Sequence, residues 1–148
     1  MEQLKMMLVD DEERFLSTTR KLLEKKGFEV QTASSGGEAL EMLRTSPVHV
    51  VVLDVKMPGM DGVATLREIK RQFPMVEVIM LTGHATVESA IDGLKSGAVD
   101  YLMKPADIEE IIEKATQAFN RRTDIEEKIR VARMRGLMKT PREMLKHA

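Results

Sequence analysis

Short apolar runs and longer amphipathic stretches alternate along the chain. The clearest run lies within residues 48–53, where four consecutive apolar residues precede Asp54 and the turn pair Pro58 and Gly59. Such a run, rich in β-branched residues, is typical of a strand that is buried on both faces. Four runs of similar length are also expected to be strands: residues 4–9, 28–33, 76–81 and 99–103. Residues 28–33 alternate apolar and polar side chains, which predicts a strand nearer the edge of the sheet.

Between these runs, apolar residues recur at the spacing of one helical face. In the first stretch that face includes Leu22 and Leu23, and in the fourth it includes Ala90, Ile91 and Leu94. Residues 34–37 are expected to form a loop and a helix cap. Five strands that alternate with five helices predict an α/β protein, in which a parallel sheet is linked by right-handed crossovers.

Composition and charge narrow the possibilities further. The 148 residues suit one domain with an appendage, and the apolar fraction of 43% is enough for a sizeable core. The net charge of −1 argues against a whole-chain affinity for nucleic acid or for an anionic membrane. The charge is uneven, because residues 121–148 hold nine Lys and Arg against four Asp and Glu. An acidic domain is therefore expected to carry a basic tail.

The chain has no cysteine and no long apolar run. The lack of cysteine excludes disulfides and thiolate zinc sites. Because no apolar run exceeds four residues, no membrane span and no signal-peptide core are predicted. We therefore expect a cytoplasmic protein with no membrane partner.

Polar residues stand where the predicted strands end. Asp10 and Asp11 follow the first strand, Asp54 the third, Thr82 the fourth and Lys104 the fifth. Parallel strands bring these ends to one rim of the sheet, where open α/β folds bind ligands. Three carboxylates together require a cation, and their oxygen ligands favour Mg²⁺ over Mn²⁺ or Ca²⁺. Asp54 is then the candidate nucleophile toward a phosphoryl group, with Lys104 and Thr82 as partners for its oxygens.

Each of these residues also has an ordinary structural explanation. An Asp pair before a helix is often an N-cap, and a single Asp after a strand is usually a turn residue. A Lys-Pro pair commonly marks a turn. The combination, with every residue at the end of a strand and in this order, carries the specificity.

Four sequence segments contain these residues: Leu8–Glu12 (LVDDE), Leu53–Gly62 (LDVKMPGMDG), Met80–His84 (MLTGH) and Asp100–Pro105 (DYLMKP). Over about residues 3–120 the chain resembles the receiver domains of two-component response regulators. It is most similar in character to receivers of regulators that carry an enhancer-binding ATPase. The resemblance implies a flavodoxin-like fold with strand order 2-1-3-4-5.

The resemblance also implies a role for each site residue. Asp54 would accept phosphate from a phosphohistidine on a sensor histidine kinase or a phosphotransfer protein. Asp11 and Asp54 would bind Mg²⁺ directly, Lys56 would lend its backbone carbonyl, and Asp10 would act mainly through metal-bound water. Lys104 would pair with the phosphoryl group.

Further implied roles concern switching and rate. Thr82 and Tyr101 would form the switch pair, and the peptide bond before Pro105 would be cis. The face built by the fourth helix, fifth strand and fifth helix would bind a downstream protein target. Lys56 and His84 would flank the path of a hydrolytic water, and because both are large we expect slow self-dephosphorylation.

The resemblance ends near residue 120. We expect residues 1–120 to form the receiver domain and residues 121–148 to form a helical extension and tail, with no separate output domain. The last helix is expected to reach about Arg135. Two interpretations of this extension stay open, a homodimer contact and a solvated linker helix. A rough heptad supports the first, although Arg122 interrupts it: Ile125, Ile129 and Ala132. The basic residues 121–146 lack aromatic interleaving, so nucleic-acid binding is not expected.

Three functions are compared. The leading one is a phosphoryl-accepting signalling module that has no enzymatic activity apart from self-catalysed phosphorylation and dephosphorylation. The second is a Mg²⁺-dependent phosphohydrolase that works through an aspartyl-phosphate, but such enzymes usually place a second acid where this chain has Lys56. The third is a phosphate-independent adaptor, which the intact set of acids disfavours. A receiver fragment of a longer transcriptional regulator is a further alternative.

Overall fold

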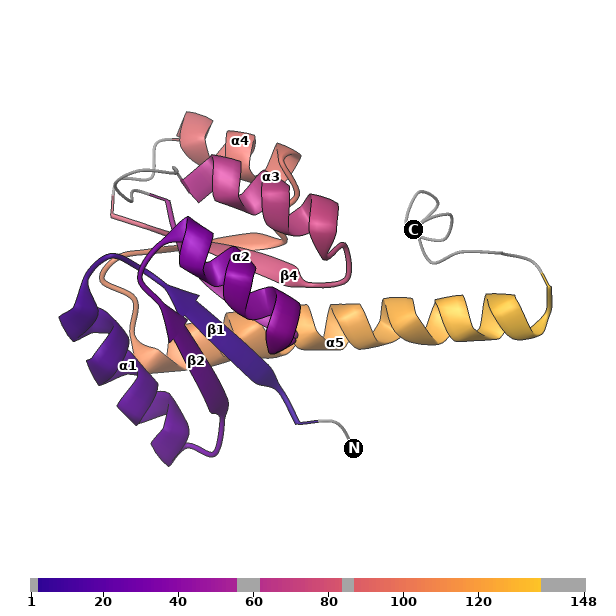
Figure 1. The fold of residues 1–148 in the computed structure, drawn as a ribbon, viewed down its shortest axis with the longest axis horizontal. Coiled ribbons are helices and arrows are strands. Elements are labelled where there is room, and N and C mark those ends of the chain that lie inside the picture. The colour runs from indigo at the N-terminus through magenta and orange to yellow at the C-terminus, as the bar shows by residue number, and fades with distance from the viewer. Residues whose placement is uncertain (1–2, 56–61, 84–86, 137–148) are drawn as a thin grey trace.

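The computed structural model describes residues 3–55, 62–83 and 87–136 (Figure 1). Strands and helices alternate along this part of the chain. The strands are β1 (Lys5–Val9), β2 (Glu29–Ala33), β3 (Val50–Asp54), β4 (Glu77–Thr82) and β5 (Asp100–Met103). The helices are α1 (Glu13–Lys25), α2 (Gly36–Thr45), α3 (Gly62–Gln72), α4 (Val87–Lys95) and α5 (Ile108–Met134).

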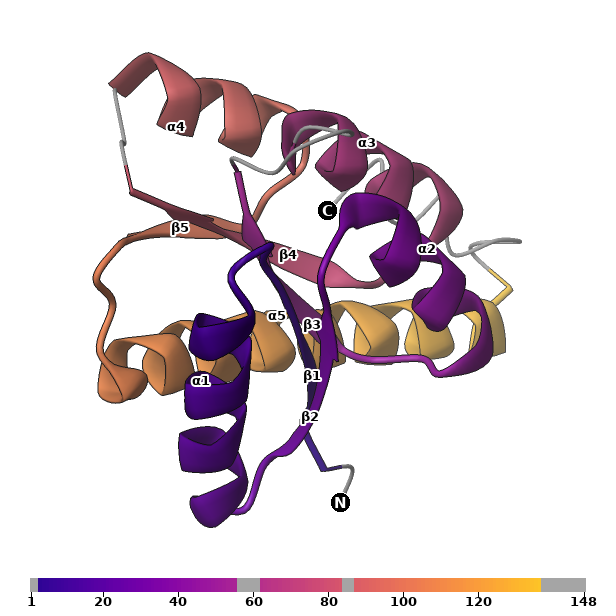
Figure 2. The same ribbon diagram turned by 60° about the vertical axis from the view of Figure 1, so that its left-hand side comes forward.

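The strands form one parallel sheet in the order β2-β1-β3-β4-β5. This arrangement confirms the predicted fold class and the edge position of residues 28–33. Figure 2 shows α1 and α5 on one face of the sheet, with α2, α3 and α4 on the other. Helices on both faces are the usual way for a parallel sheet to bury its apolar strands.

Two hydrophobic cores lie on the two faces of the sheet, because side chains along a strand alternate in direction. In β1, Met6 and Leu8 belong to the core beneath α1 and α5, whereas Met7 and Val9 belong to the core beneath α2 and α3. β3 divides its side chains in the same way, and all five of its residues are buried. The prediction of a central strand buried on both faces is therefore confirmed.

Three apolar side chains lie outside the core, contrary to the sequence interpretation. Leu22 is 44% exposed, because the buried stripe of α1 runs through Leu16, Thr19 and Leu23. Ile91 and Leu94 of α4 are 43% and 42% exposed. The predicted face of α4 is therefore correct at Ala90 and wrong at Ile91 and Leu94, since this helix approaches the sheet through its small residues.

Gly93 explains that approach. A Cβ atom built on Gly93 would lie 1.9 Å from the Sδ atom of Met80, which is buried in the sheet. Ala90 on the same helix is buried as well. The helix therefore packs closely over β4 with its smallest side chains, and its larger apolar residues are left facing outward.

The start of α2 confirms the helix cap predicted within residues 34–37, but the loop is shorter than expected. The helix already begins at Gly36, and Ser35 is its N-cap, whose hydroxyl accepts a hydrogen bond from the Glu38 backbone N–H at 3.1 Å. The Glu38 carboxylate in turn accepts from the Ser34 hydroxyl at 2.8 Å. A side-chain cap at this position makes a helical start at a glycine favourable.

α5 is the longest element and continues well past the sheet (Figure 1). Its single run to Met134 confirms the predicted extension of the last helix. Ile111 and Ala115 belong to the core under α1 and α5. Farther along, Ile125 and Ile129 are also buried, although they belong to neither core. None of the helices in the described residues combines the length and the apolar character needed to cross a membrane.

Candidate functional site

The candidate site lies at the rim where the strands of the sheet end. Asp54 is the last residue of β3 and Thr82 the last of β4, while Asp10 and Lys104 directly follow β1 and β5. The parallel register, which pairs Asp54 with Leu81 and Thr82 with Met103, aligns these ends at one edge. The sequence analysis predicted that these residues meet at one rim, which is possible only with this parallel alignment.

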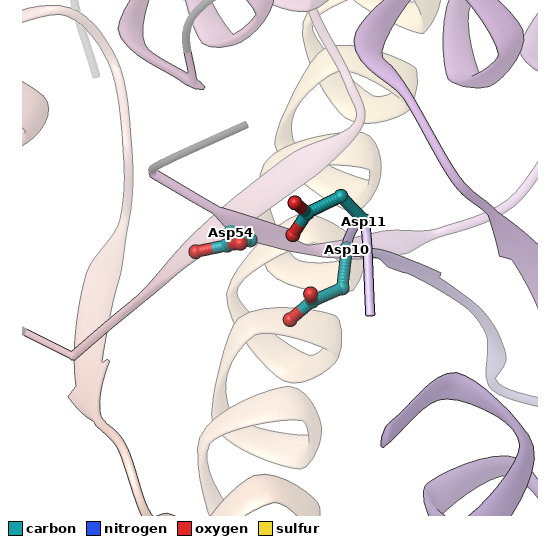
Figure 3. A group of neighbouring side chains, drawn as sticks. All are labelled: Asp10, Asp11 and Asp54. Atoms are coloured by element: carbon teal, nitrogen blue, oxygen red, sulfur yellow. The ribbon is translucent and has the colours of Figure 1, made fainter. Parts of the chain in front are cut away.

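Three carboxylates meet at this rim. One oxygen from each of Asp10, Asp11 and Asp54 lies within 4.8 Å of the others. Figure 3 shows the three side chains converging from the ends of β1 and β3. Asp10 and Asp54 are buried, whereas Asp11 is exposed, so the group has an open side toward solvent. This donor set is able to hold a metal ion, because hard divalent cations prefer carboxylate oxygens and keep water on an open side.

Asp10 is fully buried and is held by two donors. Its Oδ1 accepts a hydrogen bond from the Glu12 backbone N–H at 2.9 Å, and its Oδ2 accepts one from Lys104 Nζ at 2.7 Å. A buried carboxylate requires partners of this kind, since an unpaired charge away from water is very costly. Asp10 is therefore fixed in place as the inner member of the acidic group.

Within the described part of the chain, Lys104 is the cation of the site. Its Nζ lies 2.7 Å from Asp10 Oδ2 and 3.8 Å from Asp54 Oδ2. Burial alone would lower the pKa of Lys104, but the hydrogen bond to Asp10 and the negative charges of Asp10, Asp54 and Glu12 outweigh it and raise the pKa above its ordinary value. The ammonium therefore stays charged, and the group of three acids and one lysine carries an excess of negative charge that a divalent cation would balance.

The backbone places Lys104 beside the neighbouring strand. Its N–H donates to the carbonyl oxygen of Thr82 at 2.7 Å, which continues the β4–β5 pairing by one residue. The peptide bond between Lys104 and Pro105 is cis, the state that the resemblance implies. Thr82 itself is buried at the same rim.

Tyr101 stands apart from the acidic group. It lies on the edge strand β5, in register with Met80, and its side chain is 38% exposed. Met103, two residues farther along the strand, is also exposed. Two other predicted positions, Lys56 and His84, lie outside the described residues, so their metal and rate-tuning roles stay predictions.

Sequence reasoning missed one neighbour of the site. The ring of Phe15, in the first turn of α1, lies beneath Lys104, with 5.1 Å between Nζ and the ring centroid. In the sequence Phe15 is only one more apolar residue on a helical face. Its position beside Lys104 depends on how α1 packs against the segment after β5, which no local pattern indicates.

Comparison with known proteins agrees with this geometry. Residues 6–116 match the family described as the response regulator receiver domain. Among curated relatives, the transcriptional regulatory protein ZraR of Escherichia coli K12 is 39% identical over 117 residues, which cover 77% of this chain. The chain spans only about a quarter (26%) of the length of ZraR.

Solved structures show the same likeness. A CheY-like receiver domain from Methanospirillum hungatei superimposes with a TM-score of 0.79 at 29% identity, over 83% of this chain and 98% of that one. NtrX from Brucella abortus superimposes with a TM-score of 0.83 at 29% identity, over 98% of this chain and 33% of NtrX. These matches, together with ZraR, confirm the resemblance that the four sequence segments predicted.

Proposed function

The chain belongs to the response regulator receiver domain family, and we propose that Asp54 is the residue that accepts the phosphoryl group. The proposal is supported by one observation above all: three carboxylates and one ammonium converge at the ends of β1, β3 and β5. The partner that donates the phosphoryl group would be a phosphohistidine on a sensor histidine kinase or on a phosphotransfer protein.

The transfer requires an attacking oxygen, a leaving group and charge neutralisation. A carboxylate oxygen of Asp54 attacks phosphorus while the bond from phosphorus to the histidine nitrogen breaks, and the released imidazole nitrogen takes up a proton. Lys104 lies close enough to Asp54 to pair with a phosphoryl oxygen once the group has arrived. Asp54 is buried at the rim, so few water molecules compete for the phosphoryl group.

The acidic group fits Mg²⁺. Its donors are all carboxylate oxygens, and the group is open on the Asp11 side. Asp11 and Asp54 would bind the ion directly, Asp10 through water and Lys56 through its backbone carbonyl. When bound, Mg²⁺ would neutralise the carboxylates and the incoming phosphoryl oxygens, which otherwise repel one another.

A switch would carry the signal from Asp54 to a partner protein. Thr82 would turn its hydroxyl toward the phosphoryl group, and the ring of Tyr101 would move inward to follow it. Such a bond exists only in the phosphorylated state, so it shifts the equilibrium between two conformations. The surface near Tyr101 suits a protein partner, because it exposes several large apolar side chains on α4 and β5: Ile91, Leu94, Tyr101 and Met103.

The proposal is tested by phosphorylation with a small donor. Acetyl phosphate and Mg²⁺ should add one phosphoryl group to the wild-type chain, which intact-mass spectrometry and peptide mapping would place on Asp54. Asp54→Asn should abolish the modification, and chelation of Mg²⁺ should prevent it. Asp124→Asn, which removes an exposed carboxylate of α5, is the matched control and should be modified like wild type.

Two results would overturn the proposal. One is modification that persists in Asp54→Asn at the wild-type level. The other is sustained turnover of a phosphomonoester by the wild-type chain, which would favour a phosphohydrolase instead.

A further inference from the structure

An aromatic ring lies against the ammonium of the site. The Nζ atom of Lys104 is 5.1 Å from the centroid of the Phe15 ring, within the range of a cation–π contact. Phe15 is partly buried and packs against the core beneath α1 and α5, so the ring has a fixed support. The Lys104 side chain is 26% exposed, so water screens this contact less than it would at an open surface.

The contacts of Lys104 differ in kind. An ammonium has three N–H donors, and Asp10 Oδ2 accepts from it at 2.7 Å. Asp54 Oδ2, at 3.8 Å, is beyond hydrogen-bond distance. The face of an aromatic ring attracts the positive charge as a whole and does not hold one particular proton. The ring can therefore stay in contact with the ammonium while the hydrogen-bond acceptor is exchanged.

We propose that Phe15 is a positioning residue for phosphoryl transfer. Its ring holds the Lys104 ammonium at the rim while the hydrogen bond of the ammonium passes from Asp10 to the phosphoryl group on Asp54. This inference rests on the proposed function, since it assumes that Asp54 is the acceptor. It goes beyond that function by assigning a rate contribution to an apolar residue of α1.

The expected slowing of phosphoryl uptake follows from the strength of the cation–π contact between Phe15 and Lys104. A partly desolvated cation–π pair contributes about 0.5–2 kcal/mol. Removal of this contact should therefore slow phosphoryl uptake about two- to thirtyfold, at about 1.4 kcal/mol for each factor of ten. A ring that only fills space in the core would have no such effect when its size is kept constant.

The experiment therefore weakens the negative charge on the face of the Phe15 ring and keeps the size of the ring. Phenylalanines with one, two and three ring fluorines are incorporated at position 15 of the full chain, because fluorination weakens the negative face of the ring with little change in shape. The rate of phosphoryl uptake from acetyl phosphate with Mg²⁺ should fall stepwise along this series. Phe15→Leu should be as slow as the most fluorinated ring, and Phe15→Tyr should keep close to the wild-type rate.

Phe28→Leu is the matched control. Phe28 is partly buried against the same core, but the structure places an ammonium over the ring of Phe15 and not, within the described residues, over that of Phe28. This variant should take up phosphoryl groups at the wild-type rate. A second readout is independent of activity: in lysine-labelled protein, the aromatic ring shifts the NMR signals of the Lys104 Cε protons upfield, and Phe15→Leu should remove that shift.

The outcomes separate this inference from the proposed function. If wild type takes up a phosphoryl group on Asp54 and the fluorinated series shows equal rates, the inference is wrong and the proposed function stands. If Phe28→Leu slows uptake as much as Phe15→Leu, core packing explains both and the inference is also wrong. If wild type is not modified on Asp54, the inference and the proposed function both fail.

Discussion

At the scale of single residues, the site depends on carboxylates whose surroundings differ. Asp10 is fully buried and receives two hydrogen bonds, whereas Asp11, its neighbour in the chain, is exposed. The sequence predicted which residues lie at the rim, because strand ends and residue types are local information. It did not predict that Lys104 pairs with Asp10 more closely than with Asp54, since that choice depends on side-chain positions.

Gly62 is a residue whose small size the site requires. It is the first residue of α3, and its N–H donates to the carbonyl oxygen of Val55 at 2.9 Å. A Cβ atom at this position would lie 2.4 Å from Val55 Cα and 2.7 Å from the carbonyl oxygen of Asp54. These atoms belong to the backbone that carries the proposed phosphoryl acceptor, so they have little freedom to move aside.

We predict that Gly62→Ala lowers the free energy of unfolding by about 1–3 kcal/mol, the usual cost of forcing a methyl group into a packed region. Urea denaturation of the two proteins measures the difference. The control is Gly37→Ala near the start of α2, where nothing lies within 4 Å of the added Cβ atom. That variant should be as stable as wild type or slightly more stable, because alanine favours the helix. Equal stability of Gly62→Ala and wild type would show that the backbone can adapt.

At the scale of elements, the sequence predicted which strands and helices form, and in which order, better than it predicted which side of each helix is buried. The five strands and the course of α5 followed from apolar runs and helical spacing. The exposure of Ile91 and Leu94 in α4 did not, because this helix contacts β4 through Ala90, which the pattern did predict, and through Gly93. A pattern based on large apolar side chains does not indicate that a helix contacts the sheet through small residues.

A buried carboxylate joins helices from opposite faces of the sheet. Glu77, the first residue of β4, is buried, and its Oε2 lies 2.8 Å from Arg121 Nη1 of α5. Its Oε1 lies 3.7 Å from Lys70 Nζ of α3, which also donates to the carbonyl oxygens of Pro74 and Val76. Burial lowers the pKa of Lys70, although the nearby charge of Glu77 counteracts this effect. The ion group therefore anchors α5 just before it leaves the sheet.

We predict that Glu77→Gln destabilises the protein more than Arg121→Gln. The first change leaves a partly buried lysine without its counter-charge and should cost about 2–4 kcal/mol, near the range for broken buried pairs. The second leaves the Glu77–Lys70 pair intact and removes a half-exposed side chain, so about 1 kcal/mol is expected. Chemical denaturation gives both values.

Arg130→Gln is the control for this comparison. Arg130 pairs with Glu127 on the same helix, and both side chains are exposed. Pairs between exposed side chains contribute little to stability, so the effect of Arg130→Gln should be the smallest of the three. If Arg121→Gln proved more damaging than Glu77→Gln, the carboxylate would not be the centre of this group.

At the scale of the whole molecule, the proposed switch connects the acidic rim with the outer face of β5. Tyr101 is the only tyrosine of the chain, and there is no tryptophan. Its side chain is 38% exposed. The intrinsic fluorescence of the protein therefore reports on this one ring, which makes the proposed inward movement measurable without a label.

We predict that Mg²⁺ with beryllofluoride, a mimic of the phosphoryl group, lowers the access of acrylamide to Tyr101. The reason is that a Thr82 hydroxyl turned toward the mimic leaves space for the ring to enter. Fluorescence quenching with and without the mimic measures this change. Thr82→Ala should still bind the mimic but respond less, and Asp54→Asn should not respond. Unchanged quenching in wild type that has bound the mimic would contradict the proposed switch.

The length of α5 has a mechanical consequence. From Arg121 to Met134 the helix continues for about 20 Å, at about 1.5 Å per residue. A stiff rod of that length acts as a lever: a tilt of about 10° at its base displaces its far end by about 3–4 Å. A small repacking around Glu77 would therefore displace the far end of α5 by more than it displaces the base of the helix beside the sheet.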